Sequence, residues 1–311
     1  MQQNSSQNSE FTGSQVLLKS FKDMGIELLL GYTGGSIMPT FDTLKEFPNF
    51  RFITTRHEQG AGFIAQGYTR ACGKLAPVLV TSGPGATNLI TAVADAKMDS
   101  TPMFTVTGQV ATHVIGSDGF QEADIVGMMY TCTKYSQMAL SANEVSNIVG
   151  ELAHIATVGR PGPVNLDFPK DVQTGLTKNI NLPKKLDLPG FKVTSDPDQN
   201  DIDKAIELIS NSKRPVALVG HGARIGHCQK ELIEFLEKAN IPAAFTLHGL
   251  SSVPASYPLN LGMMGIHGEL PANRAIQKAD LMIALGMRFD DRVTAKVDEF
   301  GINAKIIHIE I

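Results

Sequence analysis

A glutamate between a predicted strand and a predicted helix is the first residue that could do chemistry. Glu58 lies in the segment RHEQGAGFIAQGYTR, after one apolar run and at the start of another with helical spacing. It is therefore expected at the carboxyl end of a parallel sheet, where open α/β folds bind ligands. By position alone, a carboxylate in a first helical turn more often complements the helix dipole. The choice between these interpretations depends on the surrounding motifs.

Three glycine-rich segments could also contact a ligand. They are GYTGGS at residues 31–36, SGPGATN at residues 82–88 and GSDGFQE at residues 116–122. Glycine lets a backbone approach a ligand closely, although the turns of βα units need glycine in any case. None of the three matches a P-loop or a G-x-G-x-x-G dinucleotide fingerprint. A nucleotide hydrolase and an unrelated dinucleotide-dependent oxidoreductase are therefore disfavoured.

Metal and serine chemistry have little support in the sequence. The histidines are scattered and form no H-E-x-x-H pair, and the cysteines form no C-x-x-C pair, so we expect no metal ligand in this chain. Ser82 lies between a predicted strand and a predicted helix, but TSGPG is not the G-x-S-x-G nucleophile elbow. A serine hydrolase is therefore discounted.

The composition of the 311-residue chain is typical of a folded α/β protein, with 42% hydrophobic and 19% charged residues. A formal net charge of −4, without a long lysine and arginine block, gives no reason to expect nucleic acid or an anionic membrane as partner. No apolar run approaches the roughly 18 residues of a membrane-spanning helix. The polar opening MQQNSSQNSE lacks the apolar segment of a signal peptide. We therefore expect a cytoplasmic protein that acts on small molecules.

Short apolar runs alternate with helical stripes along the chain, which is typical of βαβ units. Unbroken apolar runs indicate parallel strands that are buried on both faces. In the first part of the chain, strands are expected at residues 27–31, 50–54, 77–81 and 102–107, and helices at 16–24, 58–72 and 89–98. In the second part, strands are expected at 215–220, around 243, at 281–286 and at 305–311, and helices at 202–209 and 231–239. The predicted fold class is α/β, with two doubly wound parallel-sheet domains.

A change in composition separates the two domains. The segment NLPKKLDLPGFKVTSDPDQND is rich in proline, lysine and aspartate and has no periodicity, which is typical of a linker. The expected organisation is a disordered leader at residues 1–13, a first domain at 14–182, a linker at 183–200 and a second, incomplete domain at 201–311.

Six motifs, read in order, carry a family resemblance over almost the whole chain. They are GYTGGSIMPTFD, RHEQGAGFIAQGYTR, TSGPGATNLITAVADAKMDSTPM, GQVATHVIGSDGFQEADIVG, GRPGPVNLDFPKDV and GMRFDDRV. Together they resemble the large, catalytic subunits of acetolactate synthases, also called acetohydroxyacid synthases, which depend on thiamine diphosphate. The usual GYPGGA of that family is GYTGGS here.

The resemblance implies a role for Glu58 as the residue that activates the cofactor. It would hydrogen-bond the aminopyrimidine ring of thiamine diphosphate, so that pyruvate loses carbon dioxide and its hydroxyethyl group is transferred to a second 2-keto acid, pyruvate or 2-ketobutyrate. This reaction belongs to the biosynthesis of branched-chain amino acids. The catalytic residues would be Glu58, Gln121 and Lys170. The thiamine diphosphate side would include Gly34, Gly35, Pro84 and Asn88, and the substrate channel Gly35, Ser36, Phe120, Gln121 and Lys170.

The resemblance also implies FAD in the second domain, a flavin-binding middle domain that follows the pyrimidine-binding first domain. The matching positions are Arg160, Gly220, Gly222, His267, Gly286 and Arg288. In the family, Mg²⁺ and the diphosphate are bound by a third domain that these 311 residues do not contain. Further implied partners are a homodimer or homotetramer and a regulatory small subunit.

Two interpretations of the whole chain follow. In the first, it is the N-terminal portion of an acetolactate synthase, and a longer chain or a separately encoded C-terminal half supplies the rest of each site. In the second, it is a truncated, non-catalytic remnant or binding module. We expect the isolated 311 residues to hold only half of each active site.

Overall fold

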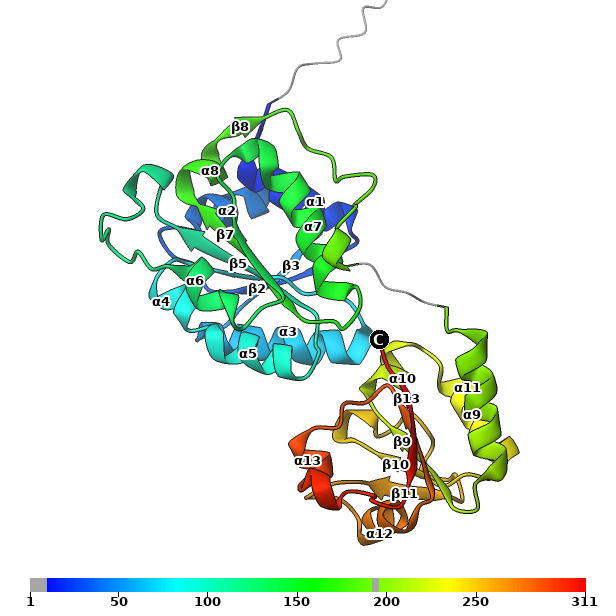
Figure 1. Ribbon diagram of the computed structural model, residues 1–311. Helices are drawn as coiled ribbons and strands as arrows, with labels where there is room; N and C mark the ends of the chain where they lie inside the picture. Colours follow the sequence, from blue (N-terminus) through cyan, green and yellow to red (C-terminus); the bar gives the residue numbers. More distant parts are fainter. Residues whose placement is uncertain (1–9, 192–195) are drawn as a thin grey trace, which may run out of the picture. The chain divides into compact units, whose positions relative to one another are not determined.

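The computed structural model describes residues 10–191 and 196–311. The chain forms two compact units, Met1–Val193 (unit 1) and Thr194–Ile311 (unit 2), which are described separately (Figure 1). The boundary between them falls within residues 183–200, where the linker was expected, although residues 192–195 lie outside the described residues.

Regular secondary structure in unit 1 begins at an earlier residue than the sequence predicts. Strand β1 (Phe11–Thr12) pairs antiparallel with β8 (Leu176–Thr177), and helix α1 (Gly13–Asp23) starts directly after it. The Thr12 side chain accepts a hydrogen bond from the Gln15 backbone, and the Gln15 side chain accepts one from the Thr12 backbone, which makes a capping box. The expected leader was therefore wrong for residues 11–13, and residues 1–9 lie outside the described residues.

Unit 1 contains a six-stranded parallel sheet in the order β3-β2-β4-β5-β7-β6. Its strands are β2 (Leu28–Gly31), β3 (Arg51–Thr54), β4 (Val78–Val80), β5 (Met103–Gln109), β6 (Tyr135–Met138) and β7 (Pro163–Pro169). The parallel sheet predicted from the apolar runs is confirmed, and β6 and β7 are strands that the sequence analysis did not anticipate.

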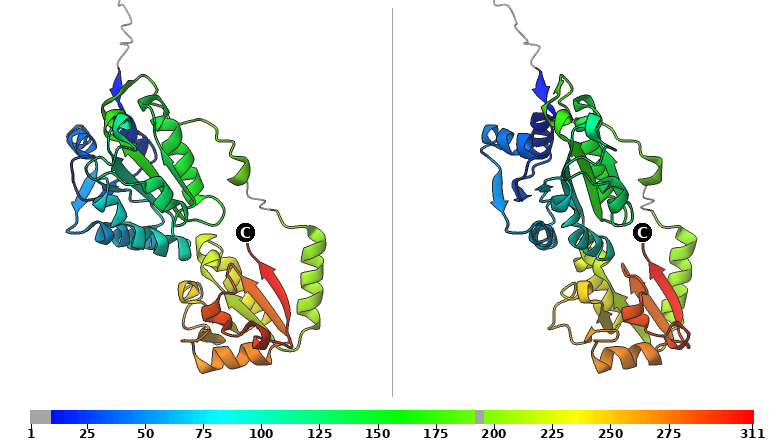
Figure 2. Two further views of the ribbon diagram at one scale, coloured as in Figure 1. Left: turned by 60° about the vertical axis from the view of Figure 1, so that its left-hand side comes forward. Right: turned by 90° about the vertical axis from the view of Figure 1, so that its left-hand side faces the viewer.

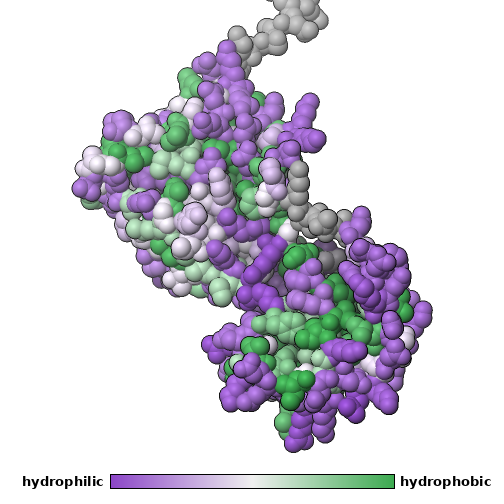
Figure 3. All heavy atoms as spheres, viewed as in Figure 1, coloured by the Kyte–Doolittle hydropathy of each residue, from purple (hydrophilic) through white to green (hydrophobic). Residues whose placement is uncertain are grey.

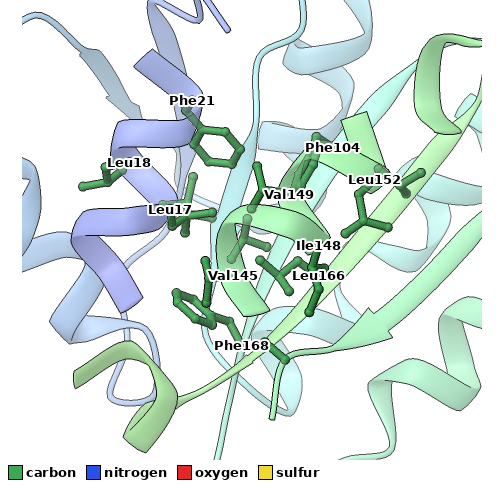
Figure 4. Close-up of a cluster of buried hydrophobic side chains, with 14 of the residues drawn as sticks. Leu17, Leu18, Phe21, Phe104, Val145, Ile148, Val149, Leu152, Leu166 and Phe168 are labelled. Atoms are coloured by element: carbon green, nitrogen blue, oxygen red, sulfur yellow. The ribbon is translucent and has the colours of Figure 1, made fainter. Parts of the chain in front are cut away.

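Helices cover both faces of this sheet. One face packs against α1, α7 (Val145–Thr157) and the shorter α2 (Met38–Thr43) and α8 (Lys170–Thr174); the other packs against α3 (Glu58–Cys72), α4 (Pro84–Thr87), α5 (Ile90–Met98) and α6 (Ile125–Tyr130). Figure 4 shows the first core, in which Phe21 of α1 meets Phe104 of β5 edge to face at 5.2 Å between ring centroids. Each large apolar side chain buried here contributes about 1.5–3 kcal/mol by removal from water.

Unit 2 contains a five-stranded parallel sheet in the order β11-β10-β9-β12-β13, which again has helices on both faces (Figure 2). Its strands are β9 (Pro215–Val219), β10 (Ala243–Phe245), β11 (Asn260–Met263), β12 (Leu281–Leu285) and β13 (Lys305–Ile309). Its helices are α9 (Gln199–Asn211), α10 (His221–Ile225), α11 (Gln229–Ala239), α12 (Leu270–Lys278) and α13 (Asp291–Thr294). Relative to β9, this is the strand order of doubly wound nucleotide-binding folds.

Apolar side chains also reach the surface of unit 2. Figure 3 shows them gathered over β13, whose Ile306 and Ile309 are more than half exposed. Across residues 10–191 and 196–311, none of the helices combines the length and apolar character that spanning a membrane requires.

Candidate functional site

The site in unit 1 lies at the point where the sheet topology reverses direction. The chain passes from β2 outward to β3, and β4 then pairs on the other side of β2. Doubly wound folds bind ligands at such a switch point, outside the carboxyl ends of the strands. The segment GYTGGS follows β2, Glu58 follows β3 and SGPGATN follows β4. The topology therefore brings three of the predicted segments to one edge of the sheet.

Glu58 is the first residue of α3 and is only 9% exposed. The chain enters this helix through His57, whose Nδ1 accepts a hydrogen bond from the Gln59 backbone N–H. The Asn88 side chain donates a hydrogen bond to Glu58 Oε2 at 2.9 Å. A dipole partner on a surface helix would need neither burial nor a side-chain donor from the next βα unit. The structure therefore gives Glu58 a fixed orientation that its position in the helix alone does not explain.

The glycines around Glu58 differ in the space that a side chain would have. A Cβ added at Gly34 would lie 2.5 Å from Thr81 Cβ, so this residue is required for packing. A Cβ at Gly85 would lie 2.8 Å from Thr81 Cγ2 and 3.4 Å from Glu58 Oε1. At Gly35, an added Cβ would meet no atom of the described residues within 4 Å. Oε1 of Glu58 thus lies beside a residue without a side chain, and Gly35 leaves open space.

Two serines join the turns that follow β2 and β4. The Ser36 and Ser82 hydroxyl oxygens are 2.9 Å apart, and the Ser36 backbone N–H donates to Thr81 Oγ1 at 3.2 Å. Ser82 is fully buried. Its hydroxyl is part of this contact between turns. The pair is made possible by Ser36, which is one of the two positions, with Thr33, at which GYTGGS differs from GYPGGA.

The loop at residues 116–122 packs directly on the turn that follows β4. A Cβ at Gly83, whose φ is +56°, would lie 2.6 Å from the Gln121 carbonyl oxygen, so only glycine permits this approach. Glu122 closes the loop by accepting hydrogen bonds from the backbone N–H groups of Gly116 and Gly119, and these bonds lower the pKa of Glu122. Gln121 is therefore brought to the predicted site, whereas the Phe120 side chain is 89% exposed.

Lys170 is carried by α8, at the carboxyl end of β7, and is exposed. The next residue, Asp171, accepts hydrogen bonds from the backbone N–H (3.0 Å) and the hydroxyl (2.5 Å) of Thr112. Burial alone would raise the pKa of Asp171, but these hydrogen bonds lower it below its ordinary value. The helix that bears Lys170 is thus tied to the segment that precedes the 116–122 loop.

Asp167 is a buried carboxylate that the sequence analysis did not single out. It lies on β7 and accepts hydrogen bonds from the Thr107 hydroxyl at 2.9 Å and the Gln109 amide at 3.1 Å. Burial, and to a smaller extent the nearby Asp124, raise the pKa of Asp167 to about 7. The Gln109 amide also donates to the Ala123 carbonyl at 2.9 Å, next to the 116–122 loop. A polar residue in a buried strand was the sequence signal for this group.

The residues predicted to bind FAD are divided between the units. Gly220 and Gly222 lie after β9, and an added Cβ at either would come within 2.6 Å of the Gly286 backbone, after β12. Backbone packing at the switch point of unit 2 is thus a sufficient reason for these glycines. His267 and Arg288 are exposed in the same unit, and Arg288 lies 3.5 Å from the Asp290 carboxylate.

Arg160 belongs to unit 1. Its guanidinium donates to the Ser100 hydroxyl at 2.7 Å and to the Met98 carbonyl at 3.2 Å, near the end of α5. The structure therefore gives Arg160 a local role, and its predicted contact with FAD stays a prediction.

Comparison with known protein families assigns both units. Residues 11–128 match the thiamine pyrophosphate enzyme N-terminal TPP binding domain. Residues 202–311 match the thiamine pyrophosphate enzyme central domain.

Curated relatives match almost the whole length of this chain. It is 43% identical to the acetolactate synthase large subunit of Corynebacterium glutamicum over 300 residues, which are 96% of this chain and 48% of that protein. It is 42% identical to the acetolactate synthase isozyme 1 large subunit of Escherichia coli over 98% of this chain and 54% of that protein. The large subunit of Lactococcus lactis is 42% identical over 96% of this chain and 52% of that protein. The chain thus spans about half the length of the curated relatives it matches.

Proposed function

The chain belongs to the thiamine pyrophosphate enzymes, and we propose that it supplies the N-terminal and central domains of an acetolactate synthase. Thiamine pyrophosphate is the cofactor called thiamine diphosphate above. The proposed reaction is the decarboxylation of pyruvate and transfer of the hydroxyethyl group to a second 2-keto acid, either pyruvate or 2-ketobutyrate.

The orientation of Glu58 is the observation that carries the proposal. Asn88 holds Oε2, so Oε1 points to the side of Gly85, where the residue has no side chain. A carboxylate held in this way can accept a hydrogen bond from a ring N–H group and keep or release a proton at a fixed place. These residues therefore fit the aminopyrimidine ring of thiamine diphosphate, which Glu58 would hold.

The cofactor, when bound, supplies the electron sink that the decarboxylation of a 2-keto acid requires. The chain's own residues would orient the cofactor and enclose the site. Gly34 and Gly35 form the wall after β2, Gln121 lies at the turn that carries Pro84, and burial of Glu58 keeps water away from its carboxylate. Ser36, Phe120, Gln121 and Lys170 are proposed to line the substrate channel, with Gln121 and Lys170 in contact with the substrate.

Further cofactors and partners are proposed from the same relationship. FAD would bind in unit 2 near Gly220, Gly222, His267, Gly286 and Arg288, and Mg²⁺ would bind in the part of the enzyme that lies outside these residues. The relatives are named large subunits, which supports a regulatory small subunit as a partner. A homodimer or homotetramer and a cytoplasmic location complete the proposal.

A fusion protein tests the proposed reaction. Residues 1–311 are joined to the part of the Lactococcus lactis large subunit that follows the matched region, and acetolactate is measured with pyruvate, thiamine diphosphate, Mg²⁺ and FAD. We expect the fusion to produce acetolactate and the isolated chain to produce none. Glu58→Gln removes the carboxylate and keeps the size of the side chain. It should therefore abolish most of this activity without a change in packing.

Glu207→Gln, on the exposed side of α9, is the matched control and should leave activity unchanged. A folded fusion without activity would favour the alternative of a non-catalytic remnant. Equal activity in the fusion and its Glu58→Gln variant would remove Glu58 from the proposed role.

A further inference from the structure

Gln173 connects α8 to the GYTGGS segment, which forms one wall of the candidate site. This residue is fully buried, and its side-chain amide donates to the Ser36 carbonyl at 2.6 Å and to the Phe168 carbonyl at 2.8 Å. Its carbonyl oxygen accepts from the Thr40 hydroxyl at 3.0 Å, and the Thr40 and Ser14 hydroxyl oxygens are also 3.0 Å apart. Both amide hydrogens and the carbonyl of Gln173 are therefore engaged.

The GYTGGS loop is thus held from two sides. On one side, Ser36 contacts Thr81 and Ser82 of the turn after β4. On the other side, its carbonyl is bound by Gln173, which is 137 residues away in the sequence. Gly35, where the loop leaves open space, is the residue before this anchor point.

The same short helix holds a second loop. Asp171 of α8 binds the backbone and the hydroxyl of Thr112, at the start of the segment that leads to Gln121. Lys170 lies one residue before Asp171 and three before Gln173. One helical turn therefore carries Lys170 and contacts both the GYTGGS loop and the segment that leads to Gln121.

We propose that Gln173 is a positioning residue, which acts through the Ser36 carbonyl and fixes the GYTGGS wall relative to Lys170. The proposal rests on the proposed function for its catalytic consequence. Glutamine suits this place because it carries two donors for the Ser36 and Phe168 carbonyls and one acceptor for the Thr40 hydroxyl. An apolar side chain of similar volume would leave both carbonyls without this donor, and a buried acceptor that loses its partner is costly.

Hydrogen exchange measures whether Gln173 holds the loop in the chain as it is. The amides of Ser36 and Ile37 donate to Thr81 Oγ1 and the Gly34 carbonyl, so their exchange reports opening of the loop. In Gln173→Leu, exchange of a peptide covering residues 32–37 should be roughly tenfold faster. The reason is that loss of a buried hydrogen bond raises the equilibrium constant for loop opening about tenfold or more. A peptide covering α5, residues 90–98, is the internal reference, because this helix packs on the other face of the sheet.

Thr40→Val is the matched control, because it removes a hydroxyl from the same buried network and leaves both carbonyl contacts of Gln173 in place. Its loop peptide should exchange within about twofold of the unchanged chain. If Gln173→Leu does not fold, Gln173→Glu keeps the shape and can donate at most one hydrogen bond, and it should still increase exchange at the loop. Unchanged exchange in the glutamine variants, or an equal increase in Thr40→Val, would overturn the proposal.

The catalytic consequence is read in the fusion described above. A displaced wall should raise KM for pyruvate or the concentration of thiamine diphosphate needed for half activity about fivefold or more in Gln173→Leu. A loss of folded protein alone would lower the apparent kcat and leave these values unchanged. Faster loop exchange with unchanged kinetic constants would overturn the positioning role. An inactive parent fusion would instead count against the proposed function, and the exchange experiment would still decide whether Gln173 holds the loop.

Discussion

Replacing Asp167 with asparagine is expected to change how the stability of unit 1 depends on pH. The carboxyl group is fully buried on β7, and burial raises its pKa from the ordinary value of 3.8 to about 7. Asparagine has almost the same shape and does not titrate. Its side-chain carbonyl can accept from Gln109, and its amide can donate to the Thr107 hydroxyl, so the buried network can remain paired.

The sign follows from proton binding. Between pH 3.8 and about pH 7, the folded protein keeps a proton on Asp167 and the unfolded chain releases it. The free energy of unfolding therefore falls as the pH rises through this window, and the contribution is fully present below it and lost above it. From pH 5 to pH 8 the loss is on the order of 3 kcal/mol, at about 1.4 kcal/mol per pH unit. Asp167→Asn should lack this loss.

Urea titration read by hydrogen-exchange mass spectrometry measures the effect on unit 1 alone, through peptides from β5 and β7. From pH 5 to pH 8, the unfolding free energy of the unchanged chain should fall by about 3 kcal/mol more than that of Asp167→Asn. Asp42→Asn, which alters an exposed carboxylate paired with Lys45, is the control and should keep the original pH dependence. Parallel pH profiles for the unchanged chain and Asp167→Asn would refute the reasoning.

Three further substitutions separate packing from function. Asn88→Ala removes the donor to Glu58 and should lower the activity of the fusion at least tenfold, by about the 1–3 kcal/mol of a buried hydrogen bond; an unchanged rate would contradict this. Gly220→Ala places a Cβ 2.2 Å from the Gly286 carbonyl oxygen and should lower the urea midpoint of unit 2 but not that of unit 1, by about 1–3 kcal/mol of overpacking, as read on β12 peptides. Phe120→Ala should change the stability of unit 1 by no more than about 0.5 kcal/mol, because the side chain is 89% exposed, and should lower kcat/KM for pyruvate in the fusion if the ring lines the channel.

The apolar runs predicted most of the central strands because burial on both faces leaves a local signature. Strands β2, β4 and β5 carry fully buried residues throughout or nearly so, and each was expected from its run. The sequence PVNLDFP of β7 breaks such a run with Asn165 and Asp167, and its strand was not anticipated. These polar residues are paired with Thr105, Thr107 and Gln109 of the neighbouring strand, which is a contact that no local pattern reveals.

The candidate site divides in the same way. Glu58, Gly34 and Ser36 could be predicted together, because turns after parallel strands meet at one edge of a sheet. The bond between Asn88 and Glu58 and the bond between Gln173 and Ser36 join residues far apart in the sequence, so they could be found only in the folded chain. The start of regular structure at Phe11 was not predicted for the same reason, because β1 pairs with the distant strand β8.

The most direct measurement of the central claim is the rate at which the thiazolium C2 proton of bound thiamine diphosphate exchanges with deuterium, followed by NMR after acid quench. The fusion should accelerate this exchange over that of the free cofactor. In the Glu58→Gln variant with the cofactor still bound, exchange should be slower by about 10²–10⁴, which is the usual contribution of a positioned acid or base. Exchange at the same rate in both proteins would contradict the account of Glu58 as the residue that activates the cofactor.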